Sequence, residues 1–182
     1  MTSLVTHLYK EGEIAVIPTD TVYGVVGRAA DPKAVTHLYE LKRRENKPGT
    51  LVAYDIDQLV ELGVEREYLT SVERFWPGAV SVIIPCGSNL DYLHQGKNSL
   101  AIRVPADPWL RSLLKETGPL ITSSANQPGE PPATTVEEAK AYFGSDVSWY
   151  EDHGVINRDP STIIQVVDGN IEIIRQGAVK VN

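Results

Sequence analysis

The sequence predicts an α/β fold in which one mixed β-sheet is covered by helices. Short apolar runs of strand length alternate with stretches whose apolar residues recur every three or four positions, which is typical of strands followed by helices. Near the end of the chain, Asp168-Gly169-Asn170 separates two further apolar runs and predicts a β-hairpin. A sheet with both kinds of connection contains parallel and antiparallel pairs.

The first half of the chain begins with a short helix and then follows this alternation. Asp31-Pro32 predicts a helix start, because an aspartate side chain caps the first turn and proline suits the first helical position. The expected elements are a helix holding Leu4, Val5 and Leu8; strands at Glu13–Pro18, Val22–Arg28 and Thr50–Tyr54; a helix that starts at Asp31-Pro32 and holds Val35, Leu38 and Leu41; and helices over Asp57–Gly63 and Glu65–Trp76.

The second half uses the same devices. Asp107-Pro108 predicts another helix start, and Thr135 with Glu138 predicts a capping box for a helix through Phe143. The expected strands are Ala79–Pro85, Ser99–Pro105, Pro119–Thr122, Thr162–Val167 and Ile171–Arg175, with a proline-rich loop at Pro128–Pro132.

Length and composition fit one globular domain over residues 1–182, with 42% hydrophobic and 23% charged residues. Acidic residues outnumber basic ones, 24 to 17, and the net charge of -7 argues against a broad nucleic-acid surface, which needs excess Lys and Arg. A local basic cleft is still compatible with this charge. The lone Cys86 and the lack of a signal peptide or long apolar run predict a protein of the reducing cytoplasm with no membrane span.

Common catalytic signatures are absent from the sequence. It contains no G-x-x-x-x-G-K-[ST], G-x-G-x-x-G or G-x-S-x-G motif. The four histidines have no metal-ligand spacing, and Cys86 beside a strand end is expected to be an inert small hydrophobe. The sequence therefore predicts neither covalent catalysis nor a transition metal held by the protein.

Polar side chains gather where three expected strands begin or end. In open α/β sheets, loops at strand ends face a shared crevice that binds ligands. Ser, Thr, Asn and Asp also favour ordinary turns, which is the commoner explanation for any single loop. Three such loops together favour a ligand rich in oxygen, such as a nucleotide or amino acid; they are Thr19-Asp20-Thr21, Ser123-Ser124-Ala125-Asn126 and Asn157–Thr162.

Two sets of cations have alternative interpretations. Lys42, Arg43, Arg44 and Lys47 lie at or beyond a helix end, where they either form a solvated face or bind phosphates. Arg103 and Arg175 stand in or at the end of apolar strands, where an unpaired guanidinium is costly. Their partner is either an internal carboxylate or an anionic substrate.

Seven motifs, in order along nearly the whole chain, resemble the YrdC-like family of threonylcarbamoyl-AMP synthases. They are "PTDTVYG", the K-x-R of "LKRRENKP", "WPGAVSVII", "SLAIRVP", "SSANQPGEPP", "DPSTII" and "IIRQG". The resemblance implies a twisted mixed sheet with helices around a deep, positively charged cleft, in the short, single-domain form of the family.

The resemblance also implies a reaction. Members form L-threonylcarbamoyladenylate and pyrophosphate from L-threonine, bicarbonate or CO2, and ATP with Mg²⁺, and other proteins transfer the threonylcarbamoyl group to tRNA. Threonine captures CO2 as a carbamate, whose oxygen attacks the α-phosphorus of ATP. No covalent enzyme residue is required, in agreement with the absent nucleophile motifs.

Residue roles carried over from the matching motifs fall into two groups. Lys42 and Arg44 would hold the triphosphate and act in catalysis. The remaining nucleotide contacts would be Ser99, Ser124, Asn126 and Arg175, and the threonine contacts would be Thr21, Arg103, Thr122 and Ser161.

The chain departs from the family pattern at three places: Glu45 directly follows the K-x-R motif, Pro132 replaces a common serine, and Gln165 replaces a common aspartate. Two other functions are therefore considered. One is an RNA-binding or ribosome-associated module of the same fold, and possible contact with tRNA through the basic cleft belongs here. The other is a related carbamoyl-adenylate enzyme with a different acceptor, as in hydrogenase maturation proteins.

Overall fold

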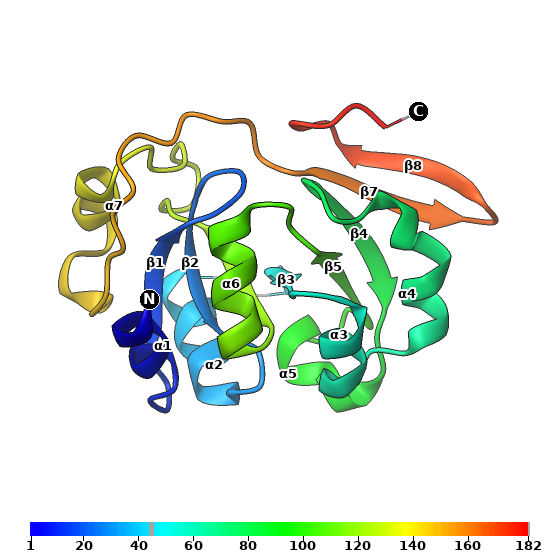
Figure 1. Cartoon of the computed structure of the whole chain (residues 1–182), viewed down its shortest axis with the longest axis horizontal. Helices are drawn as coiled ribbons and strands as arrows, with labels where there is room; N and C mark the ends of the chain where they lie inside the picture. Colours follow the sequence, from blue (N-terminus) through cyan, green and yellow to red (C-terminus); the bar gives the residue numbers. More distant parts are fainter. Residues whose placement is uncertain (44–45, 182) are drawn as a thin grey trace.

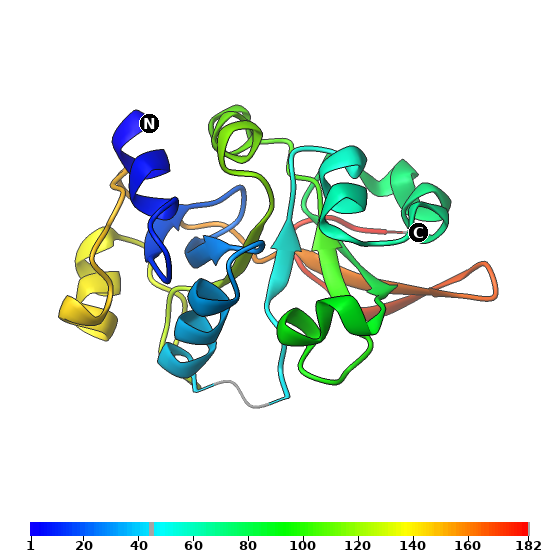
Figure 2. The same ribbon diagram turned by 90° about the horizontal axis from the view of Figure 1, so that it is seen from below.

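A computed structural model describes residues 1–43 and 46–181, which form one eight-stranded sheet with helices on both faces (Figures 1 and 2). The strand order is β1-β2-β6-β3-β5-β4-β7-β8. The β3/β5 and β4/β7 pairs are parallel and all other neighbouring pairs are antiparallel. The predicted mixed α/β architecture is confirmed. None of the helices within the described ranges has the length and apolar character needed to cross a membrane.

The elements follow the expected order. The strands are β1 (Ile14–Pro18), β2 (Tyr23–Arg28), β3 (Thr50–Val52), β4 (Val80–Pro85), β5 (Ser99–Arg103), β6 (Leu120–Ser124), β7 (Thr162–Val167) and β8 (Asn170–Arg175). The α-helices are α1 (Thr2–Leu8), α2 (Pro32–Leu41), α3 (Ile56–Leu62), α4 (Arg66–Val72), α5 (Asp91–His94), α6 (Pro108–Thr117) and α7 (Val136–Phe143). The sequence patterns missed the four-residue helix α5, and the expected helix Glu65–Trp76 divides into α4 and a 3-10 turn at Glu73–Phe75.

Two local signals act as predicted. The Asp31 carboxylate accepts bonds from the backbone N–H groups of Lys33 and Ala34, at 2.9 and 3.3 Å, and so caps α2. Asp168 and Gly169 have φ values of 50° and 77°, the left-handed conformations of a two-residue hairpin turn.

The capping box at α7 forms only in part. Thr135 Oγ1 accepts from the backbone N–H of Glu138 at 3.2 Å, as predicted. The Glu138 carboxylate, however, accepts from the backbone N–H and the hydroxyl of Thr134, at 2.7 and 2.9 Å, instead of from Thr135. These bonds lower the pKa of Glu138, because they favour its ionised form.

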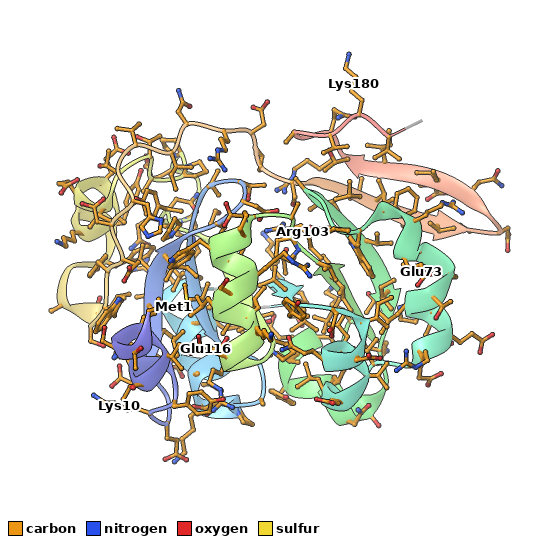
Figure 3. The ribbon with its side chains drawn as sticks, in the orientation of Figure 1. Met1, Lys10, Glu73, Arg103, Glu116 and Lys180 are labelled. Carbon is orange, nitrogen blue, oxygen red and sulfur yellow. The ribbon has the colours of Figure 1, made fainter. Side chains whose placement is uncertain are left out.

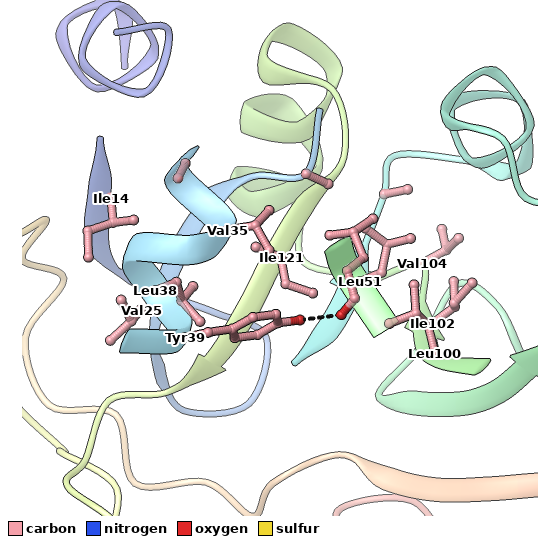
Figure 4. Packing of buried hydrophobic residues seen from close by; sticks show 14 of the residues in the cluster. Ile14, Val25, Val35, Leu38, Tyr39, Leu51, Leu100, Ile102, Val104 and Ile121 are labelled. Atoms are coloured by element: carbon pink, nitrogen blue, oxygen red, sulfur yellow. Dashed lines mark hydrogen bonds between the residues drawn. The ribbon is translucent and has the colours of Figure 1, made fainter. Parts of the chain in front are cut away.

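The two faces of the sheet carry separate apolar clusters. On one face, Val35, Leu38 and Tyr39 of α2 lie beside strand residues of the core, and the Tyr39 hydroxyl donates to the Leu93 carbonyl at 2.6 Å (Figure 4). The cluster on this face also contains residues of α3, α4 and α5. On the other face, residues of α1 and α6 cover Ala15, Ile17, Val26, Val52 and Leu120.

The second face is left partly uncovered over β5, β4 and β7. Ala101, Ile83 and Gln165 lie on this face by register and are only partly buried. Where the cover by α1 and α6 stops, polar residues such as Arg103, Thr122 and Ser124 lie on this face beside the apolar ones. This boundary positions the site.

Candidate active site

A cavity of about 240 Å³ opens at this boundary, among residues of six strands and of the loops next to strand ends. Six residues predicted from the sequence line it together. They are Thr21, Arg103, Thr122, Ser124, Ser161 and Arg175, and they are joined by Thr19, Thr50 and Ser123 among others. A larger hollow of about 500 Å³, beside Tyr54, Trp76 and Arg111, contains none of the predicted site residues.

The Pro18–Val22 corner is both a turn and a wall of the cavity. Thr19 Oγ1 donates to the Val22 carbonyl at 2.6 Å and accepts from the backbone N–H groups of Thr21 and Val22, both at 3.2 Å. These bonds are ordinary threonine turn chemistry. The turn nevertheless places Thr19 and Thr21 on the cavity, so the two explanations of this polar corner are compatible.

Arg103 lies in the interior of the molecule (Figure 3), and it lines the cavity although it is buried. Its Nη2 is 2.9 Å from Asp20 Oδ1, and the two side chains are only 4% and 8% exposed. Its Nη1 donates to Ser81 Oγ at 3.2 Å. The internal carboxylate expected as one alternative is therefore present. The pair is incompletely bonded, because neither Arg103 Nε nor Asp20 Oδ2 has a partner among the described residues.

Arg175 reaches the same cavity from the edge strand β8. A register shift in the β7–β8 pair sets Ile164 opposite Ile173 but Ile163 opposite Arg175, so Ile174 is an extra residue. The shift brings Arg175 to the face of the sheet on which the cavity lies. Its Nε and Nη2 donate to the Ser161 carbonyl at 3.2 and 2.8 Å, and Nη2 also reaches Ser161 Oγ at 3.3 Å.

Lys42 is 4% exposed, so it is not part of a solvated helix end. Its ammonium donates to the Ser124 carbonyl at 2.7 Å and to Asn126 Oδ1 at 2.9 Å, and it also contacts the Asn126 carbonyl. Ser124 Oγ donates to the same Asn126 Oδ1 at 2.7 Å. Lys42 and Asn126 do not line the cavity themselves; they hold Ser124, which does.

The other predicted nucleotide contacts are less closely gathered. Arg44 lies outside the described residues. Arg43 is exposed, with φ of 46°. Ser99 is partly exposed at the start of β5, two residues before the cavity residue Ala101, and does not line the cavity. Pro132, which stands in place of a serine common in the family that the chain resembles, lines the cavity and supplies no hydroxyl.

Sequence reasoning missed Ser81 and did not identify Asp20 as the partner of Arg103, whereas Ser123 belongs to a polar loop that was predicted to face the ligand. Ser81 is fully buried, and its Oγ is 3.0 Å from Ser161 Oγ. Ser123 Oγ is buried without a partner in the part of the chain that the structure describes, and the residue lines the cavity. A single hydroxyl within the apolar run "AVSVIIP" was the available signal for Ser81.

Among the described residues, titratable groups are the possible nucleophiles and metal ligands. Burial raises the pKa of the Cys86 thiol to about 11, so this thiol is protonated near neutral pH and a poor nucleophile. Over residues 1–43 and 46–181, no three His, Cys, Asp or Glu side chains gather as a metal site. What the cavity offers is two guanidinium groups, several hydroxyls and a buried ion pair, which suit binding and orientation of oxygen-rich anions.

Comparison with known proteins agrees with this arrangement. The family model Sua5_yciO_yrdC, described as "Telomere recombination", matches residues 7–177. A Mycobacterium tuberculosis protein named "Putative threonylcarbamoyl-AMP synthase" is 34% identical, over 93% of this chain and 81% of its own. "Threonylcarbamoyl-AMP synthase" of Bacillus subtilis is 31% identical, over 94% of this chain but only 52% of its own.

A solved structure extends the likeness to the fold. "P. abyssi Sua5 complexed with L-threonine" superposes with a TM-score of 0.82 at 26% identity, over 96% of this chain and 53% of that one. This chain thus spans about half of that protein. The family match runs from the end of α1 through β8. The chain belongs to the Sua5/YciO/YrdC family.

Proposed function

We propose that this protein is an L-threonylcarbamoyladenylate synthase, a nucleotidyltransferase that makes threonylcarbamoyl-AMP and pyrophosphate from L-threonine, bicarbonate or CO2, and ATP. Relatives bearing the synthase name, at 31% and 34% identity, support the activity. The threonine complex of the P. abyssi protein supports the amino-acid substrate. The product would serve threonylcarbamoyladenosine modification of tRNA through separate transfer proteins, in the cytoplasm.

One observation carries the proposal: two arginines from strands far apart in the sequence converge on one small, hydroxyl-lined cavity. Its volume of about 240 Å³ lies below the range of roughly 300–1,000 Å³ typical of sites for larger ligands, and suits an amino acid. ATP would therefore extend from the cavity over the uncovered face of β5, β4 and β7.

The residues divide the work as follows. Thr21, Arg103, Thr122 and Ser161 would hold threonine. Lys42, Arg44, Ser99, Ser124, Asn126 and Arg175 would hold the nucleotide. Catalysis then consists of bringing the carbamate oxygen to the α-phosphorus and stabilising charge on the departing pyrophosphate. Mg²⁺ would enter with ATP as part of the substrate and neutralise phosphate charge.

The test is to incubate the protein with ATP, Mg²⁺, bicarbonate and L-threonine, and to follow both pyrophosphate and the adenylate by mass spectrometry. We expect pyrophosphate release to need threonine and bicarbonate together. Release at the same rate without threonine would contradict the proposal. An enzyme with a different acceptor would release pyrophosphate only when that acceptor replaces threonine.

An RNA-binding module is the second candidate, and charge separates it from the synthase. A chain of net charge -7 should bind tRNA only weakly at physiological salt, and ATP should compete if both use the same cations. Titrating labelled tRNA with and without ATP measures this. Tight tRNA binding that is indifferent to ATP would favour the module.

A further inference from the structure

Ser81 connects the two arginines of the cavity without lining the cavity itself. It lies in β4, is fully buried, and faces the side of the sheet on which Arg103 and Ser161 lie. Its Oγ accepts a bond from Arg103 Nη1 at 3.2 Å and is 3.0 Å from Ser161 Oγ. Ser161 in turn accepts from Arg175. The result is a continuous hydrogen-bonded chain from Arg103 to Arg175.

Donor counting sets the direction of the Ser81–Ser161 bond. Guanidinium groups only donate, so both serine oxygens already act as acceptors. If Ser161 donated to Ser81, the Ser81 hydrogen would be buried with no acceptor in the described part of the chain, which is costly. If Ser81 donates to Ser161, the Ser81 hydrogen has an acceptor and the Ser81 oxygen accepts from Arg103. The second direction is therefore favoured.

This direction decides what Ser161 offers to a ligand. Its oxygen accepts from Ser81 and from Arg175 Nη2, so both lone pairs are used. Its own hydrogen is then directed toward the cavity that Ser161 lines. A hydroxyl in this state donates to a ligand oxygen but cannot accept from an ammonium group.

We propose that Ser81 is a positioning residue: it orients Arg103, links Arg103 to Arg175, and sets Ser161 as a donor to the carboxylate of the bound amino acid. The link between the arginines is independent of the ligand, whereas the carboxylate contact rests on the proposed function. Ser81 acts on the amino acid only through Arg103 and Ser161.

The link can be tested in the free protein by NMR of arginine Nε–H groups. Arg103→Lys and Arg175→Lys each remove one signal and thereby assign it. In Ser81→Ala, we expect a large shift of the Arg103 signal and a smaller shift of the Arg175 signal. The control is Thr117→Val, which removes a buried hydroxyl that bonds the Leu113 and Gly118 carbonyls instead. An unchanged Arg103 or Arg175 signal in Ser81→Ala overturns the link.

Calorimetric binding tests the effect on the ligand. Ser81→Ala should weaken L-threonine binding about tenfold, because a hydrogen bond to a charged group is lost. The affinity for ATP in the absence of threonine should change less than about twofold, because Arg175 still donates to the Ser161 carbonyl in this variant. Ser81→Thr, which keeps the hydroxyl, should recover most of the loss.

L-Threoninol, which lacks the carboxylate, separates positioning from general damage. The preference of the protein for threonine over threoninol should shrink in Ser81→Ala and stay unchanged in Thr117→Val. An equal loss of affinity for both ligands would overturn the positioning role. If the unaltered protein bound neither threonine nor ATP, the proposed function would fail, while the NMR measurement would still decide the link.

Discussion

Arg103 and Arg175 follow the same sequence pattern, a cation in or after an apolar strand, but occupy opposite environments. Arg103 belongs to β5, inside the sheet, is 3% exposed, and is paired with Asp20. Arg175 belongs to the edge strand β8, is exposed, and donates to the Ser161 carbonyl. The difference follows from position in the sheet, because a cation inside the sheet needs a counter-charge whereas one at the edge retains water.

The comparison indicates a division of labour within one cavity. The interior arginine stabilises the fold, since its removal would leave Asp20 buried without its counter-charge, and under the proposed function it would also hold the amino acid. The edge arginine can be devoted to the ligand, because solvent tolerates its charge in the free protein. Stability and activity should therefore separate at the two positions.

The largest expected effect is on stability at the interior pair. Asp20→Ala leaves the Arg103 charge buried and unpaired, which should lower the free energy of unfolding by about 3–5 kcal/mol. Arg175→Ala should lower it by about 1 kcal/mol or less. Urea denaturation of both variants measures the contrast. Similar losses in the two variants would show that the environments do not differ as described.

At Arg175 in the edge strand, substitution should reduce activity much more than stability. Arg175→Ala should slow pyrophosphate release roughly a hundredfold, about 3 kcal/mol of transition-state stabilisation, with little change in melting temperature. Arg175→Lys should also be impaired, because an ammonium cannot reproduce two parallel N–H donors. Near-normal kinetics in Arg175→Ala would remove this residue from the nucleotide site.

Lys42, at the end of α2, is a third cation to compare, because it is buried and donates to backbone and amide oxygens. Lys42→Ala should reduce the rate on the order of a hundredfold and also destabilise the protein, because Lys42 is buried against the loop after β6. Arg44→Ala, predicted from the K-x-R motif alone, should reduce the rate similarly, and Arg44→Lys should be impaired. Arg43→Ala is the internal control, since Arg43 is exposed. Rates of pyrophosphate release at saturating threonine, measured with melting temperatures, distinguish the three alanine variants. Equal, mild losses of rate in all three would contradict the assignment of Lys42 and Arg44 to the triphosphate.

Local patterns predicted the strands well because each strand is a short apolar run between turn signals. Strand order was beyond reach, because it depends on pairings between distant segments, such as β2 with β6. The same limit applies to the ion pair, whose partners Asp20 and Arg103 are 83 positions apart. The sequence could require a counter-charge for Arg103 without indicating which carboxylate supplies it.

The candidate site shows the same contrast between local and distant information. Thr21, Thr122, Ser124 and Ser161 could be predicted because they lie in or beside polar loops at strand ends. Ser81 could not, since its role depends on the β4–β7 register that sets it beside Ser161. The solvated alternative for Lys42 is wrong for a similar reason: the end of α2 lies beside the loop after β6, which only the folded chain shows.

The smallest expected effect is on the discrimination between threonine and serine, and it should depend on the interior Arg103 and not on Arg175. L-Serine lacks one methyl group of threonine, and one methyl in a pocket gives about 1–3 kcal/mol, so kcat/KM for serine should be roughly tenfold or more below that for threonine. Arg175→Lys should lower both values by the same factor, because the edge arginine would contact the nucleotide. Arg103→Lys should change the ratio, because a shorter reach and fewer donors let the amino acid shift in the cavity. Steady-state kinetics with both amino acids at saturating ATP measure the ratio of kcat/KM for threonine to that for serine. A ratio altered by Arg175→Lys and unchanged by Arg103→Lys would reverse the assignment of Arg103 to the amino acid and of Arg175 to the nucleotide.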